Sequence, residues 1–99
     1  MTVKEKTGRR RYVAFTVDPL FGKETLISAL RKASGDPPYV IQCREGWCIV
    51  RCTPGSVDST ITVMRNADPS SVSLRTSGTL RTLRERYPEL ERLRPPRKV

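Results

Sequence analysis

Residues 39–52 read YVIQCREGWCIVRC, two short runs of strand-forming residues separated by one dipeptide. Residues 39–44 and 47–52 are rich in β-branched and aromatic side chains, which favour extended backbone. The dipeptide Glu45-Gly46 between them is typical of a tight turn that joins antiparallel strands. The stretch therefore predicts a β-hairpin, and the elements on either side of it decide to which fold the hairpin belongs.

Upstream of the hairpin, the sequence predicts one strand and one helix. Residues 11–17 (RYVAFTV) alternate, with Val13 and Phe15 on the same face, as in a half-buried strand. Residues 22–33 carry apolar side chains at helical spacing. A loop rich in Pro and Gly at residues 34–38 then leads into the hairpin.

Downstream of the hairpin, the sequence predicts a helix, a strand and another helix. The first helix starts near residue 53, where Thr followed by Pro suits an N-cap and a first helical position. Residues 72–76 alternate as a strand, and residues 77–79 (SGT) start a third helix that runs to about Tyr87. Pro88 interrupts or restarts this helix. Its apolar stripe consists of Leu80, Leu83, Tyr87 and Leu90.

The predicted order is therefore β-α-β-β-α-β followed by a C-terminal helix. This is the order of the ferredoxin-like fold of the α+β class, in which one antiparallel sheet carries helices on one face. We expect residues 1–10 to form a basic flexible arm, residues 11–87 a single domain and residues 88–99 a basic tail. In this topology the last strand lies antiparallel beside the first, so the end of strand 72–76 should lie beside the start of strand 11–17.

Charge is distributed unevenly along the 99 residues, whose net charge is +9. Residues 1–11 have a net charge of +4, residues 12–74 of zero and residues 75–99 of +5. Because the predicted fold brings the two charged ends to one rim of the sheet, they should form a single basic patch. A basic patch of this kind favours a polyanion partner, most often nucleic acid.

Several function classes have no support in the sequence. There is no histidine, no apolar run of membrane-spanning length and no apolar stretch like the core of a signal peptide. Cys43, Cys48 and Cys52 are an odd number without a CxxC pair, so we expect neither a zinc site nor a disulfide framework, but reduced thiols in a cytoplasmic protein. No nucleophile–base pair, paired carboxylates or phosphate loop is present, so the polypeptide itself is expected to have no catalytic residues, bound cofactor or metal.

Arginine dominates the basic residues, and its planar fork suits contact with phosphates. The alternative is a solvated helix face with ragged basic ends. A second candidate site is residues 77–79, where free backbone N–H groups at a helix start attract anions, although ordinary capping by Ser77 explains this pattern equally well. The predicted RNA-binding residues are Arg9, Arg10, Arg11, Arg75, Ser77, Gly78, Thr79, Arg81, Arg84, Arg97 and Lys98.

One face of the predicted sheet carries Tyr12, Trp47 and Ile49. An RNA-recognition motif stacks bases on aromatic side chains of its central strands, but here only Trp47 occupies an aromatic place of that pattern. Base stacking on this sheet is therefore not expected. The face suggests either a protein partner with these three residues as contacts or cover by the C-terminal helix, whose leucine stripe favours core packing.

Two segments together resemble a known family. Residues 46–52 (GWCIVRC), followed by a helix and then by residues 73–83 (SLRTSGTLRTL), resemble ribonuclease P protein component 2, the archaeal counterpart of the eukaryotic Pop-five subunit. Residues 10–15 (RRYVAF) also fit the first strand of that family, so the resemblance extends from about Arg9 to Tyr87. The chain departs from longer members in a short first-helix region and in residues 88–99.

The resemblance implies an RNA-recognition-motif-like α/β sandwich without the aromatic base-stacking set. It also implies a subunit of ribonuclease P, the endoribonuclease that cleaves the 5′ leader from precursor tRNA. In that ribonucleoprotein the RNA and its Mg²⁺ ions are catalytic. The protein stabilises the RNA together with protein component 3, a TIM-barrel-like subunit, in a heterodimer that can pair into a dimer of heterodimers. The alternative is a generic RNA- or ribosome-associated module of the same fold with no role in tRNA maturation.

Overall fold

The computed structural model describes residues 10–35 and 37–94. The strands and helices follow one another as the sequence predicts, except that the C-terminal helix is divided in two. The elements are β1 (Arg11–Thr16), α1 (Lys23–Ala33), β2 (Tyr39–Arg44), β3 (Trp47–Cys52), a 3₁₀ turn η1 (Pro54–Ser56), α2 (Val57–Ala67), β4 (Val72–Ser77), α3 (Leu80–Arg86) and α4 (Pro88–Arg92).

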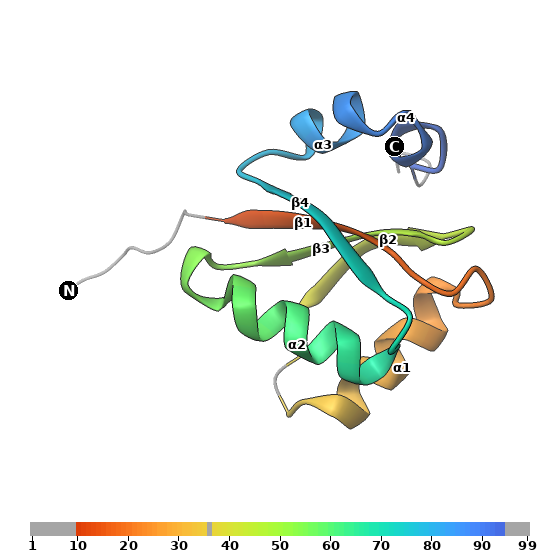
Figure 1. The fold of residues 1–99 in the computed structure, drawn as a ribbon, viewed down its shortest axis with the longest axis vertical. Coiled ribbons are helices and arrows are strands. Elements are labelled where there is room, and N and C mark those ends of the chain that lie inside the picture. Colours follow the sequence, from red (N-terminus) through yellow and green to blue (C-terminus); the bar gives the residue numbers. More distant parts are fainter. Residues whose placement is uncertain (1–9, 36, 95–99) are drawn as a thin grey trace, which may run out of the picture.

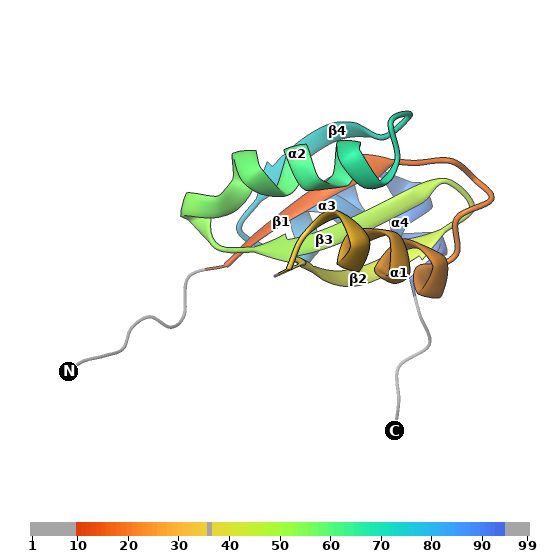
Figure 2. The same cartoon turned by 90° about the horizontal axis from the view of Figure 1, so that it is seen from below.

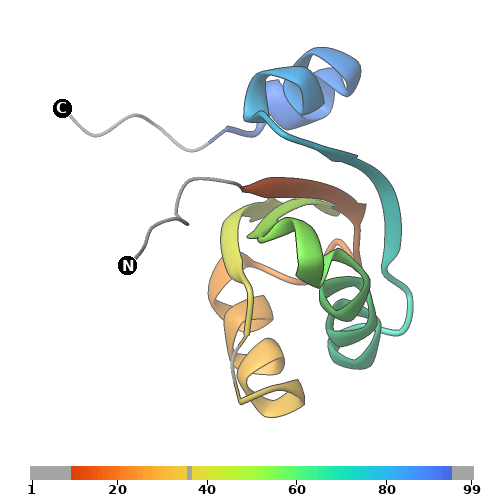
Figure 3. The same cartoon turned by 90° about the vertical axis from the view of Figure 1, so that its left-hand side faces the viewer.

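The described part of the chain is an α+β structure built around one four-stranded sheet. The strand order is β2-β3-β1-β4, and every neighbouring pair is antiparallel. Helices α1 and α2 cover one face of the sheet, whereas α3 and α4 lie over the other, so the molecule has three layers (Figures 1 and 3). The view in Figure 2 places α1 and α2 in front of the sheet and the two C-terminal helices behind it. The expectation of helices on one face therefore holds for α1 and α2 only.

The β2–β3 hairpin closes at the predicted dipeptide. Glu45 and Gly46 both have positive φ angles, 52° and 87°, as a type I′ turn requires. The segment that follows β1 approaches Gly46 closely, because the Val17 N–H donates to the Gly46 carbonyl at 2.9 Å. A Cβ on Gly46 would lie 3.3 Å from the Val17 carbonyl oxygen. Glycine therefore suits this position, because it adopts the positive φ angle readily and has no side chain to crowd that oxygen.

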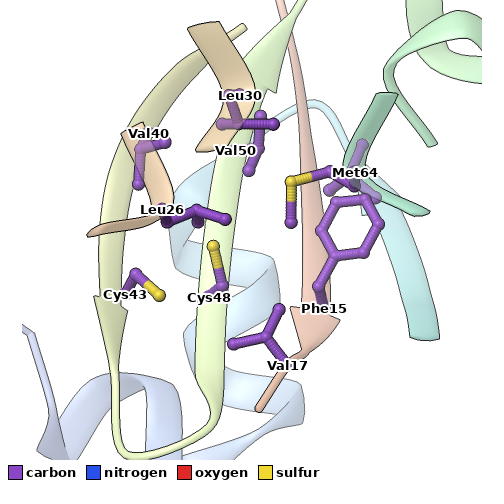
Figure 4. Close-up of a cluster of buried hydrophobic side chains, with 10 residues drawn as sticks. Phe15, Val17, Leu26, Leu30, Val40, Cys43, Cys48, Val50 and Met64 are labelled. Atoms are coloured by element: carbon purple, nitrogen blue, oxygen red, sulfur yellow. The ribbon is translucent and has the colours of Figure 1, made fainter. Parts of the chain in front are cut away.

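The first hydrophobic core lies between the sheet and helices α1 and α2 (Figure 4). Leu26 and Leu30 of α1 and Met64 of α2 are fully buried against it. These residues come from the apolar stripes that helical spacing predicts. The strand side chains of this core are Val13, Phe15, Val40, Cys43, Cys48 and Val50, and Val17 joins them just beyond β1.

A second hydrophobic core lies on the opposite face, beneath α3 and α4. It is formed by Ala14 and Ile49 from the sheet and by Leu83 and Leu90 from the helices, all with no exposed surface. Residues 88–93 are thus part of the folded domain rather than of a tail, which corrects the expected boundary at residue 87. The reason is local: Pro88 starts a new helix after Tyr87 leaves the helical conformation, and this helix turns Leu90 toward the sheet.

No helix in the described ranges is long and apolar enough to cross a lipid bilayer.

Candidate nucleic-acid interface

The start of β1 and the end of β4 lie side by side, as the predicted topology requires. Tyr12 pairs with Ser77 across the two strands. A Cβ on Gly78 would lie 3.6 Å from Nη1 of Arg11, so this guanidinium rests against the segment that leaves β4. The same Nη1 donates to the Arg10 carbonyl at 3.1 Å. Two basic segments that are more than sixty residues apart in sequence therefore meet at one edge of the sheet.

We call Arg10, Arg11 and Arg75 the basic rim. Arg10 and Arg75 are exposed and Arg11 is half-buried. Arg75 stands on the edge strand β4, opposite Ala14 of β1 and two residues before Ser77. No acidic partner is assigned to these three side chains within the described residues. Among the described residues, the rim therefore presents Arg10 and Arg75 to solvent with no acidic side chain paired to them.

The segment 77–79 is used for capping in this structure. The Ser77 Oγ accepts from the Thr79 N–H at 3.2 Å, and the Thr79 Oγ1 accepts from the Thr82 N–H at 3.2 Å. Thr79, not Ser77, is the N-cap of α3, which has only seven residues. Two of the N–H groups that an anion would use are therefore already bonded, so the geometry favours the capping interpretation of residues 77–79.

Arg84 is only partly exposed, and a buried side chain holds its guanidinium. Its Nη2 donates to Oε1 of the buried Gln42 at 2.7 Å, and its Nε is buried without a hydrogen-bond partner among the described residues. Burial lowers the pKa of Arg84, the positive charge of Arg94 lowers it further and Glu91 opposes the shift. Arg84 therefore anchors α3 to β2, in contrast to its predicted place on a free RNA-binding surface.

An open groove of about 680 Å³ lies between α3 and α4. We call it the arginine groove, because four of the residues that line it are arginines. Arg81 at its edge bonds Glu85 through Nε at 3.0 Å, but the Arg81 side chain is 86% exposed, so this ion pair contributes little and leaves the charge accessible. The lining residues are Arg81, Arg84, Glu85, Pro88, Glu91, Arg92 and Arg94.

Sequence reasoning missed Arg92 and Arg94 as parts of a binding surface. Nη2 of Arg94 lies 3.4 Å from Oε2 of Glu91. Nη2 of Arg92 lies 3.9 Å from Oε1 of Glu45 in the hairpin turn. Both arginines belong to the basic C-terminal segment, which was the only signal available in the sequence. Their convergence with Arg81 depends on the direction in which α4 leaves Tyr87, and helical periodicity does not encode that direction.

The predicted partner contacts Tyr12, Trp47 and Ile49 lie under the C-terminal helices. Ile49 has no exposed surface, and the other two are partly buried in the second core. The Trp47 ring is tilted against Tyr87, with 6.1 Å between the ring centroids. Ile49 therefore offers no contact to a partner protein while α3 and α4 are in place. Leu83 and Leu90 of the predicted leucine stripe cover this face of the sheet instead.

Three predicted RNA-binding residues, Arg9, Arg97 and Lys98, lie outside the described residues, as does most of the predicted arm 1–10. In the described ranges, no group of three or more acidic or cysteine side chains is placed to hold a metal ion. Comparisons with protein-family models, with curated protein sequences and with solved structures give no match for this chain.

Proposed function

We propose that this chain is the RNA-binding protein component 2 of a ribonuclease P, which cleaves the 5′ leader from precursor tRNA. The observation that carries the proposal is the basic rim, where Arg10 and Arg11 meet the segment that follows Arg75. Arginines gathered at one edge of a rigid sheet neutralise phosphates that lie close together in a folded RNA. The resemblance of residues 46–52 and 73–83 to ribonuclease P protein component 2 suggests that this RNA is the ribonuclease P RNA.

The topology supports the same proposal. An antiparallel four-stranded sheet with α1 and α2 on one face is compatible with the ferredoxin-like and RNA-recognition-motif-like folds that we propose for this chain. In an RNA-recognition motif, bases stack on the face that α3 and α4 cover here. Under this proposal the protein therefore binds RNA through phosphate contacts at the rim and along the arginine groove, not through base stacking.

Catalysis in the proposed complex belongs to the RNA and its Mg²⁺ ions. The protein lowers the Mg²⁺ concentration at which the RNA holds its active shape, because arginine charges replace part of the counterion atmosphere. A TIM-barrel-like protein component 3 is the proposed protein partner, in a heterodimer or a dimer of heterodimers.

Reconstitution tests the proposal directly. We expect the chain, together with component 3, to stimulate cleavage of precursor tRNA by a ribonuclease P RNA at low Mg²⁺. The double variant Arg10→Gln/Arg11→Gln should lose most of this stimulation. Its matched control, Arg31→Gln/Lys32→Gln, removes the same charge from the exposed end of α1 and should retain it.

Two results would contradict the proposal. If the chain binds RNA but does not stimulate cleavage, the alternative function, a generic RNA-binding module of the same fold, replaces the proposed one. Cleavage by the polypeptide alone, without the RNA component, would place the catalytic residues on this chain.

A further inference from the structure

Cys43 and Cys48 face each other across the β2–β3 hairpin. They are directly paired in the register, next to the closing pair of Arg44 and Trp47. In a two-residue hairpin the closing pair exchanges both backbone hydrogen bonds, so the pair beyond it is of the non-hydrogen-bonded type. At such a pair the Cα atoms are about 4.5 Å apart, which is within the span of about 4.4–6.8 Å that disulfides bridge.

Both sulfur atoms lie on the same side of the sheet. Figure 4 shows the two side chains on adjacent strands, turned into the first hydrophobic core, and both belong to its buried cluster. Within the described residues all three cysteines are free thiols. Cys52 lies four residues beyond Cys48 on β3, about 13 Å away along the strand, so these two cannot be joined without unfolding.

The two thiols differ in their surroundings. Cys43 stands on the edge strand β2 and is 6% exposed, whereas Cys48 on the inner strand β3 is fully buried. The Cys43 thiol donates to the Phe21 carbonyl at 3.8 Å. The neighbouring Cys48 side chain lowers the pKa of Cys43, whereas the Cys43 side chain and burial raise the pKa of Cys48. Cys43 is the nucleophile of the pair, because it is the thiol that a small disulfide can reach from the edge strand and because its lowered pKa favours the thiolate, the attacking species in disulfide exchange.

We propose that Cys43 and Cys48 are a redox-active dithiol, which a low-molecular-weight disulfide converts into a reversible cross-strand disulfide. The Cys43 thiolate attacks one sulfur of the small disulfide, forms a mixed disulfide and releases one small thiolate. The Cys48 sulfur, after losing its proton, attacks the Cys43 sulfur and releases the second small thiolate. Two protein thiols are oxidised to one disulfide, the small disulfide is reduced to two thiols, and the two cysteine protons end on them.

The experiment uses the full chain in buffers of increasing ratio of oxidised to reduced glutathione. The reaction is stopped with acid, the chain is unfolded and free thiols are alkylated with N-ethylmaleimide. We expect the mass spectrum to pass from three alkylated cysteines to one, with no glutathione attached, and peptide mapping to place the remaining label on Cys52. Dithiothreitol should restore all three.

The variant Cys52→Ser is the matched control, because it removes the thiol that takes no part. It should pass from two alkylated cysteines to none at the same glutathione ratio as the unchanged chain. Cys43→Ser should form no intramolecular disulfide, but the comparison of the unchanged chain with Cys52→Ser decides the matter even if this core variant does not fold. Three alkylated thiols at every ratio, glutathione retained on Cys43, or a disulfide that includes Cys52 would each overturn the proposal.

Discussion

Gln42 is a buried amide in the middle of β2, and it holds both C-terminal helices. Its Nε2 donates to the Leu90 carbonyl at 3.0 Å, and its Oε1 accepts from Arg84 at 2.7 Å. The side chain is only 2% exposed, so water does not replace these partners. Because a buried polar group that loses its partner keeps its full desolvation cost, Gln42 and Arg84 should depend on each other for their contribution to stability.

This dependence is measurable in a double-mutant cycle. Gln42→Leu should lower the free energy of unfolding by about 1–3 kcal/mol, because it leaves the Arg84 guanidinium and the Leu90 carbonyl without partners. Arg84→Met should cost a similar amount by leaving Oε1 of Gln42 unpaired. The double variant should lose less than the sum of the two, as urea unfolding followed through the fluorescence of the single tryptophan, Trp47, can measure. Strict additivity would show that the two side chains act independently.

At the scale of elements, Asp68 ties together two connections at the end of the sheet opposite the basic rim. Its Oδ2 accepts from the Asp18 N–H at 2.9 Å, and its Oδ1 accepts from the N–H and the hydroxyl of Ser70 at 3.0 and 2.7 Å. The loop after β1 is thereby joined to the loop before β4. Burial raises the pKa of Asp68, but the hydrogen bonds from Asp18 and Ser70 outweigh it, so the pKa is lowered.

The lowered pKa predicts a defined loss of stability in acid. In the folded protein Asp68 takes up its proton at a lower pH than in the unfolded chain, so the unfolded chain binds more protons in the interval between the two pKa values. The contribution of Asp68 should be complete above the unfolded value of about 4 and should disappear as the pH falls through the folded value. Urea midpoints measured from pH 6 to pH 2 should show this fall.

Asp68→Asn is the variant for comparison, because it keeps one acceptor oxygen but does not titrate. Its urea midpoint should change less with pH over the same interval than that of the unchanged chain. Equal pH dependence of the two proteins would mean that other carboxyl groups cause the acid loss.

At the scale of the whole molecule, the segments that carry the net positive charge differ from the segment that forms most of the hydrophobic core. The stretch 12–74, which contains most of the sheet and both helices of the first core, has no net charge, and the excess lies in the two terminal segments. The antiparallel pairing of β1 with β4 joins those segments at one edge. Within the described residues, the fold therefore brings Arg10 and Arg11 to the end of the strand that carries Arg75, and the proposed function uses this edge to contact RNA phosphates.

Under the proposed function, this arrangement predicts that RNA binding depends strongly on salt concentration. If about six phosphates are contacted, the logarithm of the affinity should fall with the logarithm of the salt concentration with a slope of about −4 to −5. Arg10→Gln/Arg11→Gln should make this slope shallower by about one for each phosphate that the variant no longer neutralises, whereas Arg31→Gln/Lys32→Gln should leave it unchanged. Filter binding or fluorescence anisotropy from low to moderate salt measures it, and a slope near zero would rule out phosphate contacts as the source of affinity.

Much of the element order was accessible from sequence because its signals are local. The hairpin at residues 39–52 and the strand at β1 follow from period-two patterns and a turn dipeptide, which depend on near neighbours only. The meeting of Arg11 with Gly78 was also predictable, since it follows from the order of elements and the antiparallel pairing of the outer strands. These predictions needed no knowledge of how any side chain packs.

The direction of individual side chains was not accessible in the same way. Arg84 carries the same charge as Arg81 and lies three residues away on α3, yet one guanidinium is bonded to a buried amide and the other is exposed. The difference depends on Gln42, which is forty-two residues away in sequence. A helical stripe identifies the apolar face but does not show which neighbouring polar residue finds a buried partner.

By itself the sequence determined the order of strands and helices, the position of the hairpin turn and the segregation of charge, because each of these depends on local pattern or composition. Only the tertiary structure decided that α3 and α4 cover the second face of the sheet, that Ile49 is core and that Arg92 and Arg94 share a groove with Arg81. The physical reason is that both faces of the sheet are apolar. The helix restart at Pro88 and the long-range hydrogen bonds of Gln42 determine how the last two helices lie on the second face.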